Sequence, residues 1–391
     1  VNIWHSVFDT TYTRQIIGGL TQEVVDRLLA RGGAAINDYN PSTYARLNSA
    51  ELICQLDALI REHPTIRPFL HTRFVRPLVR DGRVTEAIVE DRTGRRAIRA
   101  KVFIDASGDG DLLARAGLPT EKRDDLQPPT VCAILAGVDD VQAADASFNL
   151  GGALCDPAHP KALPVGFVWS SPIPGLPGLR MIAGTRVSGA DCSDADQLTA
   201  AEMEGRRQAR AMRDILADRP GGQSVALAQV ASYIGVRETR HACCLYRLTE
   251  QDLLTGVRFD DAIANGSYRV DVHHSGRPGL TFRYLDGREE YLVPGRPTVI
   301  GRWREPIDED PTFYQIPYRS LVPRGAVNVL AAGRLIDADR GAYGATRVMV
   351  NCNQTGQAAG AAAVLAIRGA CGVADVDAGE IRGAIDWRCG V

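Results

Sequence analysis

The sequence predicts a mixed α/β fold in which an inserted, mostly β, domain separates two α/β parts. Two apolar stretches, residues 102–105 and 327–332, each read as a strand that ends in a glycine-containing turn, which is typical of α/β units. Between them, residues 121–314 combine dense proline with short strand-like runs. A chain of 391 residues favours two or three domains.

The N-terminal part predicts two helices, over residues 21–30 and 49–62. Thr21 and Ser49 are the candidate N-caps, because a hydroxyl can accept from the free N–H groups of a first helical turn. An apolar stripe at helical spacing predicts the buried face of the second helix: Leu52, Leu56, Leu59 and Ile60.

Residues 74–104 change to a period of two. Three strands are predicted, at 74–79, 84–90 and 97–104, joined by the turn signals Asp81-Gly82 and Thr93-Gly94. This pattern indicates a β-meander that leads directly into the first glycine-rich turn and a short helix over residues 112–116.

The middle and the end of the chain predict further elements. Short strands are expected at 131–136, 166–169 and 181–187, with a long polar helix over 198–218. An Ala-rich helix is expected over residues 355–367. Gly356 and Gly360 lie four residues apart in it, a spacing that lets a helix approach a sheet closely.

Composition excludes several function classes. With 45 basic and 47 acidic residues, the net charge of -2 argues against a nucleic-acid or membrane-surface protein. The 9 cysteines have no ligand spacing, so no metal site or disulfide framework is expected, and reduced thiols favour a cytoplasmic protein. No apolar run reaches the ~20 residues of a membrane span. Kinase, P-loop, hydrolase and zinc-protease motifs are missing from the sequence.

The segment Gly108-Asp109-Gly110-Asp111 follows an apolar strand and is similar to a dinucleotide fingerprint. Glycines there let the backbone approach a phosphate at a helix N-terminus. Asp109 and Asp111 would repel a pyrophosphate, so the alternative is a tight strand–helix turn that binds nothing.

A second candidate site runs from Gly333-Arg334 to residues 347–357. A strand end, a glycine turn and a helix N-terminus lie close together here, and the helix end favours a ligand that carries negative charge. The alternative is a helix that packs on a sheet without a ligand.

Two further groups are candidates for the substrate. In residues 235–240, Arg237 or Arg240 could orient an anionic group, or the two could form a buried ion network with Glu238. His273 and His274 face opposite ways on a strand, so one of them at most enters a site, and His273 is the candidate proton carrier. His5 is a further isolated candidate.

Taken together, residues 104–111, 235–240, 268–273 and 328–334, with Arg347 and 356–360, resemble FAD-dependent oxidoreductases of the glutathione-reductase type of flavin fold. Within these oxidoreductases, the sequence resembles the group that includes proteins similar to the A-type subunit of heterodisulfide reductase. The segments occur in the family's order and span most of the chain.

The resemblance implies a Rossmann-like FAD-binding domain over residues 41–120 and 315–391, a substrate or cap domain over 121–314, and a partial N-terminal segment over 1–40. It implies that backbone atoms near Val75 contact the adenine and that a helix near Asn353 faces the flavin pyrimidine, where Arg347 stabilises the anionic reduced form. The implied cofactor-binding residues are Val75, Ala106, Ser107, Gly108, Gly333, Arg334, Arg347, Asn353, Thr355 and Gly356.

The family's first strand and G-x-G-x-x-G turn would lie before Val1, so we expect a fragment, or a truncated form that binds FAD weakly. The leading hypothesis is an enzyme that moves hydride or electrons between FAD and an unidentified small organic substrate, with His273, Arg237 and Arg240 as catalytic candidates. An electron-transfer partner or a homo-oligomer is compatible with it. The alternatives are a non-catalytic remnant or scaffold of the family, and an NAD-binding module that uses Gly108 and Gly110.

Overall fold

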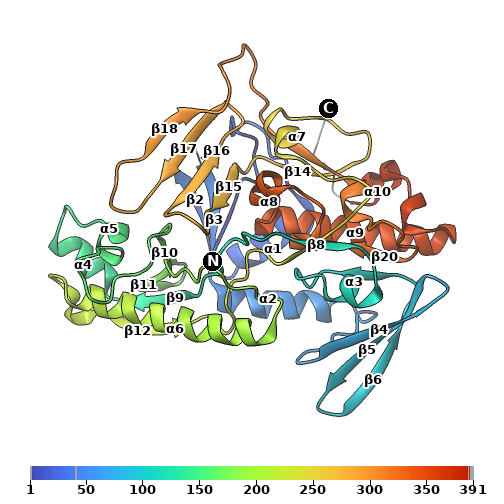
Figure 1. Cartoon of the computed structure of the whole chain (residues 1–391), viewed down its shortest axis with the longest axis horizontal. Coiled ribbons are helices and arrows are strands. Elements are labelled where there is room, and N and C mark those ends of the chain that lie inside the picture. The colour runs from blue at the N-terminus through green and yellow to red at the C-terminus, as the bar shows by residue number, and fades with distance from the viewer. Residues whose placement is uncertain (1, 40–41, 386, 388–391) are drawn as a thin grey trace.

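The computed structural model describes residues 2–39, 42–385 and 387, and it confirms the mixed α/β class. Figure 1 shows several small sheets and, toward the right of the view, the C-terminal helices. The first part forms an antiparallel sheet in the order β1-β3-β2 with two helices beside it. Its elements are β1 (Ile3–His5), α1 (Gly19–Leu29), β2 (Ala34–Tyr39), β3 (Ser42–Leu47) and α2 (Ser49–Arg61).

Both predicted N-terminal helices are present, but their caps differ from the prediction. Gly18 precedes α1, and Thr21 lies buried inside the helix, where its hydroxyl accepts from Asn353 Nδ2 at 3.2 Å. Asn48, rather than Ser49, caps α2. The predicted stripe of α2 is confirmed only in part: Leu52 and Leu59 are half-buried against the N-terminal core, whereas Leu56 is 41% exposed.

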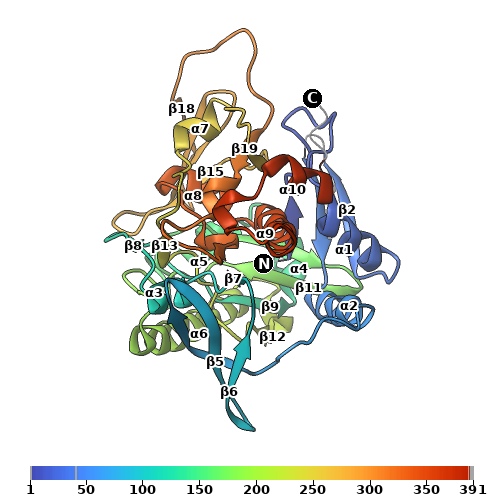
Figure 2. The ribbon, with the colours of Figure 1, turned by 90° about the vertical axis from the view of Figure 1, so that its right-hand side faces the viewer.

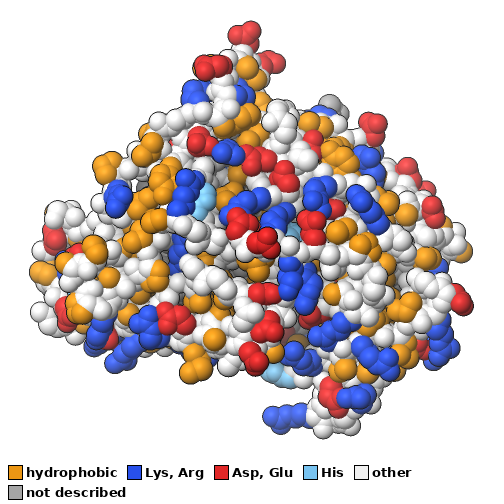
Figure 3. Space-filling view, viewed as in Figure 1, with side chains coloured by type: hydrophobic (Ala, Val, Ile, Leu, Met, Phe, Trp, Pro, Cys, Tyr) orange, Lys and Arg blue, Asp and Glu red, His pale blue; other side chains and the backbone are white. Residues whose placement is uncertain are grey.

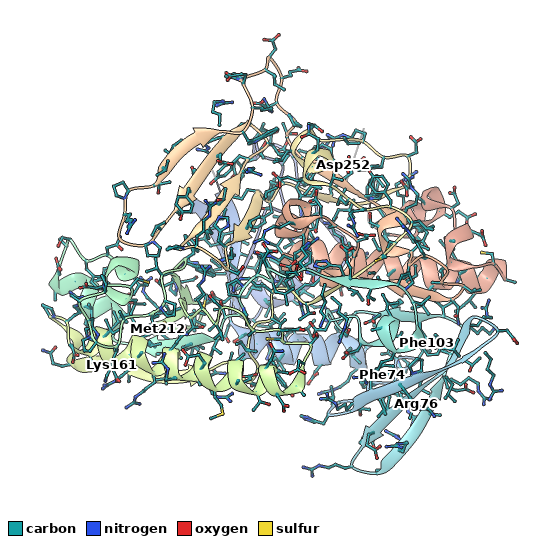
Figure 4. The ribbon with its side chains drawn as sticks, viewed as in Figure 1. Phe74, Arg76, Phe103, Lys161, Met212 and Asp252 are labelled. Atoms are coloured by element: carbon teal, nitrogen blue, oxygen red, sulfur yellow. The ribbon has the colours of Figure 1, made fainter. Side chains whose placement is uncertain are left out.

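The β-meander is confirmed as an antiparallel sheet in the order β4-β5-β6. The predicted third strand is two strands, because the chain leaves the meander and pairs elsewhere: β7 lies parallel to β20, with Phe103 opposite Val329. Phe74 and Phe103 share one core cluster beside α3 (Figure 4). The elements are β4 (Arg73–Arg80), β5 (Arg83–Asp91), β6 (Gly94–Arg99), β7 (Phe103–Asp105), α3 (Asp111–Ala116) and β20 (Val329–Ala331).

The middle of the chain forms a four-stranded antiparallel sheet in the order β10-β11-β9-β12, and α6 runs along it (Figure 1). Met212 of α6 is fully buried in the core between helix and sheet (Figure 4). Two of the strands lie several residues away from the predicted positions. The elements are β9 (Cys132–Ala136), α4 (Val138–Ala144), α5 (Leu150–Leu154), β10 (Trp169–Ile173), β11 (Leu176–Ala183), α6 (Ala195–Ala217) and β12 (Ala226–Val230).

The second half contains the antiparallel sheet β15-β16-β17-β18, the pair β14-β19 and the helices that carry the candidate site. The principal core of this part contains the alanine face of α9, with Ala358, Ala359 and Ala362 fully buried. The elements are α7 (Glu250–Leu254), β14 (Ala262–Gly266), β15 (Val270–His273), β16 (Leu280–Arg283), β17 (Arg288–Leu292), β18 (Val299–Arg302), β19 (Tyr314–Pro317), α8 (Arg340–Thr346), α9 (Met349–Gly369) and α10 (Ala378–Ala384).

Two expectations for α9 were wrong. The helix begins at Met349 and not near Thr355, because tertiary hydrogen bonds hold its first turns: Asn351 Nδ2 donates to the hydroxyl of Tyr314 at 3.0 Å. A Cβ at Gly356 or Gly360 would meet no atom within 4 Å. The glycine face of α9 is therefore open rather than packed closely on a sheet. Figure 2 views this helix nearly along its axis.

Short strands and turns complete the fold. Of these, β8 and β13 pair antiparallel and bring residues 120–122 beside the segment that contains Arg240. They are β8 (Thr120–Lys122) and β13 (Arg240–Ala242), with 3-10 turns at Gly222–Ser224, Tyr318–Leu321, Gly333–Leu335 and Val373–Asp375.

Candidate active site

The turn after β7 is closed by its own side chains. Asp105, buried at the end of the strand, accepts through Oδ2 from the backbone N–H groups of Leu112 at 2.9 Å and Leu113 at 3.1 Å. Ser107 Oγ donates to Asp105 Oδ1 at 2.6 Å and accepts from the Gly110 N–H at 3.1 Å. The first N–H groups of α3 are thus satisfied within the protein, which favours the tight-turn interpretation over a primary phosphate cradle.

This turn lies directly against the turn after β20. Gly108 has φ +78°, a backbone conformation that favours glycine, and a Cβ there would displace the guanidinium of Arg334. Arg334 Nη2 lies 3.5 Å from Asp109 Oδ1. On the other side, the Gly333 N–H donates to Thr355 Oγ1 at 3.1 Å. The turn after β7 and the turn after β20, more than 220 residues apart in sequence, therefore lie against each other, as the leading hypothesis requires.

The predicted residues on α9 differ in what they can offer a ligand. The side chain of Asn353 is turned toward Thr21 on α1, and Thr355 is engaged with Gly333 and, at 3.1 Å, with the Cys352 carbonyl. Gly356 lies beside open space. No side chain caps the N-terminus of the helix at Val348.

A buried polar cluster centres on Asp271. Tyr268 donates to Asp271 Oδ2 at 2.9 Å, and His273 Nε2 lies 3.3 Å from Asp271 Oδ1. Arg347 Nη2 donates to the Asp271 carbonyl at 3.2 Å and lies 3.3 Å from its Oδ2. The backbone N–H of His273 donates to Gln127 Oε1 at 3.1 Å. His273 and Asp271 are 7% and 6% exposed, so water screens this cluster little.

The environment fixes the charges in this cluster. Burial opposes ionisation of Asp271, but His273 and Arg347 outweigh it and hold the pKa of the carboxyl well below its usual range. Burial, followed by the positive charge of Arg237, lowers the pKa of His273 to about 4. At neutral pH the cluster therefore contains an ionised carboxylate, a neutral imidazole and guanidinium groups.

Arg237 interacts both with this cluster and with the two adjoining turns after β7 and β20, which we call the paired turns. Its guanidinium donates to the Pro128 carbonyl and, at 2.6 Å, to Thr130 Oγ1. Burial and then the nearby Arg347 charge lower its pKa to about 10. The Arg237 carbonyl accepts from the hydroxyl of Tyr343, which also interacts with Arg334. Arg334, Tyr343 and the Arg237 carbonyl thus interact in turn, and the Arg237 guanidinium lies within electrostatic range of Arg347 and Asp271.

Arg240 belongs to a different place. It donates to the Asp109 carbonyl at 3.1 Å and lies 3.5 Å from Asp111, so it supports the turn after β7 and does not join His273. The ion network suggested for residues 237–240 is also not formed among the three residues proposed for it. Glu238 instead pairs with Arg123 and with His241, whose Nε2 lies 3.0 Å away.

Val75 lies at a bulge of β4, where its carbonyl accepts from Arg115 of α3 at 2.5 Å. Ala106 and Ser107 are exposed beside the turn after β7. These three positions lie near α3.

Sequence reasoning missed Asp271, Tyr268 and Tyr343 as site residues. The spacing Asp271-Val272-His273 puts the carboxyl and the imidazole on one face of a strand, and this signal was readable. The contact of Arg347 with Asp271 spans 76 residues of sequence and left no local signal.

Neither a metal cluster nor a membrane-spanning helix is found among the described residues. No group of three or more His, Cys, Asp or Glu residues is arranged to hold a metal ion. No helix there has the length and apolar character that a membrane crossing demands.

Comparison with known proteins identifies the family. A family model for FAD-dependent oxidoreductases matches residues 2–385, and the chain therefore belongs to this family, whose cofactor is FAD. Comparison with curated proteins gave no significant match.

Three solved structures are similar to this chain at low sequence identity. BexE, from a study of oxidation in BE-7585A biosynthesis, is 14% identical over 93% of this chain and 54% of its own, with a TM-score of 0.40. The p-nitrophenol 4-monooxygenase PnpA from Pseudomonas putida DLL-E4 is 11% identical over 63% of this chain and 55% of its own, at 0.32. The myxobacterial FAD-dependent halogenase CndH is 10% identical over 93% and 66%, at 0.38. The chain thus spans little more than half of the first two of these proteins.

The residues described here fit an anionic cofactor such as FAD. Arg347 Nε is buried without a hydrogen-bond partner among the described residues, although its Nη2 is engaged. A buried, unsatisfied donor on a guanidinium suits a negatively charged or carbonyl acceptor. Gly356, on the helix that follows Arg347, lies beside open space.

Proposed function

We propose that this chain transfers hydride or electrons between FAD and a small organic substrate, with the flavin held between the paired turns and the Asp271 cluster. The observation that carries the proposal is the neighbourhood of the two groups: Arg334 and the Arg237 carbonyl both interact with Tyr343, and the Arg237 guanidinium lies within electrostatic range of Arg347, which pairs with Asp271. This neighbourhood brings the segments predicted for the cofactor near those predicted for the substrate. FAD supplies the redox chemistry, and the protein supplies binding, orientation and charge.

Each residue has a proposed role. Arg347 stabilises negative charge on the reduced flavin, and Asp271 positions Arg347 and His273. His273 is neutral at pH 7 and can exchange a proton with the substrate, whereas Arg237 orients an anionic substrate group. Arg240 supports the turn after β7 through Asp109 and Asp111.

The remaining cofactor contacts are proposed for the backbone at Val75 and residues 106–108, for Gly333 and Arg334, and for the first turns of α9. This assigns residues 41–120 and 315–391 to the FAD domain and 121–314 to a cap over the substrate. Within the family, the four matching segments favour the group similar to the A-type subunit of heterodisulfide reductase. We further propose a cytoplasmic protein that works with an electron-transfer partner or as a homo-oligomer.

The alternatives receive less support. A module that binds NAD through Gly108 and Gly110 needs free N–H groups at α3, but Asp105 and Ser107 already occupy several of them. A non-catalytic scaffold does not require an ionised carboxylate, a neutral imidazole and an unsatisfied guanidinium donor in one buried cluster, an arrangement that is costly to maintain.

The test is replacement of Arg347 in the full chain. We expect Arg347→Ala to weaken FAD binding about tenfold, and to shift the midpoint potential of the retained flavin to more negative values by roughly 30 mV per tenfold loss of preference for the reduced form. Equilibrium dialysis and spectroelectrochemistry measure the two quantities. Arg347→Lys should shift the potential less than Arg347→Ala does, because lysine keeps the positive charge and loses only the two-pronged hydrogen bonding.

Arg213→Ala is the matched control, since Arg213 also donates to a backbone carbonyl, that of Val225, at 3.2 Å, but lies on α6. Its flavin properties should equal those of the wild type. A wild-type chain that stays colourless after refolding with FAD would contradict the proposed function. Identical potentials for wild type and Arg347→Ala would remove Arg347 from its assigned role.

A further inference from the structure

A second polar site lies on the other face of β15. A cavity of about 180 Å³ is bordered by β15, β16, the first residue of α7 and the start of α8. Val270 and Val272 line it, whereas Asp271 and His273, which alternate with them, face the cluster described above. At ~30 Å³ per water, the cavity has space for about six waters, which suits a compact ligand and is too small for a dinucleotide.

The lining of this cavity is rich in positive charge. It contains Arg277, Arg283 and Arg340 but a single carboxylate, Glu250. Arg283 is paired with Glu250 at 2.5 Å and, outside the cavity, with Glu289 at 2.5 Å. Two of the three guanidinium groups are compensated, because Arg340 pairs with Asp125. On the face of the molecule that Figure 3 draws, blue and red side chains are mixed over the middle.

Arg277 is the exception. Among the residues that the structure describes, no Asp or Glu forms a salt bridge with it. Its Nη2 donates to His274 Nε2 at 2.9 Å and lies 3.4 Å from Thr281 Oγ1, and its guanidinium stacks over the Tyr291 ring at 4.8 Å from the centroid. The guanidinium is thereby held at the cavity with its charge uncompensated, which is the condition for recruiting an anion from solution.

His274 supports this arrangement as a neutral group. Its Nε2 accepts from Arg277 and faces the hydroxyl of Thr281 at 2.8 Å, so its proton is on Nδ1. Burial, and then the charges of Arg277, Arg340, Arg186 and Arg283, lower the pKa of His274 to about 4. Four arginines acting on one imidazole in the same direction indicate a positive potential at the cavity.

We propose that this cavity is a binding site for a small oxyanion, a carboxylate or a phosphate, anchored by Arg277 beside His274 and Thr281. The site is separate from the proposed flavin site, since β15 lies between them. It does not depend on FAD, and its test needs no flavin.

Isothermal titration of the full chain with inorganic phosphate and with succinate, at matched ionic strength in chloride, tests the site. We expect saturable binding of at least one probe with a dissociation constant near 1 mM, and at least about tenfold weaker binding to Arg277→Gln. Arg67→Gln is the matched control, because Arg67 is also exposed and stacks over an aromatic ring, that of Phe69, at 5.0 Å.

The two probes separate the two sources of the ligand. Binding of phosphate alone indicates a phosphorylated ligand, binding of succinate alone indicates a carboxylate, and binding of both indicates a general oxyanion site. Absence of saturable binding by either probe would overturn the proposal. So would equal affinity of the wild type and Arg277→Gln, or equal weakening in Arg67→Gln.

Discussion

At the scale of single residues, His273 illustrates how burial decides protonation. The imidazole is 7% exposed, and Asp271, Arg237, Arg347 and Gln127 surround it. Its nearest carboxylate favours the charged form, but burial and the two guanidinium groups outweigh that effect. The folded protein therefore binds the proton of His273 more weakly than the unfolded chain does.

This difference predicts a specific pH dependence of stability. Between pH 6.5 and about 4 the unfolded chain carries a proton on this histidine that the folded protein does not, so the stability contribution of neutral His273 falls as the pH falls. At pH 4.5 the loss relative to pH 7 should be ~2 kcal/mol. We expect urea unfolding to show a smaller loss over this range for His273→Gln than for the wild type.

The comparison of the two proteins isolates His273. The pKa values of His5 and His274 are also lowered to about 4, so both contribute the same kind of slope to the wild type and the variant alike. Parallel stability curves for the two proteins would show that His273 is not held neutral by its surroundings.

Elements differ in how far local sequence determines them. The β-meander was predicted because Asp81-Gly82 and Thr93-Gly94 are turn signals between strands of period two, and all of this information is local. The start of α9 was not predicted, because hydrogen bonds to residues far away in sequence hold its first turns. Asn351 donates to the Tyr314 hydroxyl, and Gln354 donates to the Asn265 carbonyl. The strand that carries His273 was likewise assumed from local sequence. The contact of Arg347 with Asp271 of that strand was not predicted, because it joins residues far apart in sequence.

The short helix α3 depends on one buried side chain. Asp105 accepts from two backbone N–H groups of the first turn and from Ser107, so Asp105→Ala leaves buried donors unsatisfied. We expect a loss of ~2–3 kcal/mol in the free energy of unfolding, measured with urea. Asp105→Asn should lose less, since the amide oxygen still accepts.

Asp377 provides the control for this substitution. It caps α10 at the surface with one bond, to the Glu380 N–H at 3.0 Å, and Asp377→Ala should cost only ~1 kcal/mol. Equal losses for the two alanine variants would mean that Asp105 acts as an ordinary surface cap, and the tight-turn account of α3 would fail.

At the scale of the whole molecule, chain segments far apart in sequence meet around α9. The helix buries its alanine face in the principal core and leaves Gly356 and Gly360 beside open space, one turn apart. A glycine inside a helix costs ~0.5–1 kcal/mol relative to alanine, and neither position repays this cost through a contact with the residues described here. Gly356 therefore provides a direct test of whether the flavin approaches α9.

Gly356→Ala and Gly360→Ala should each raise the free energy of unfolding of the chain without FAD by ~0.5–1 kcal/mol, as measured with urea. If the flavin contacts the first turns of α9, Gly356→Ala should also weaken FAD binding about tenfold, whereas Gly360→Ala, one turn farther along the helix, should not. A stabilised Gly356→Ala variant that binds FAD as tightly as the wild type would exclude Gly356 from the cofactor site. Because the gain in stability reports correct folding, that result could not be attributed to a damaged protein.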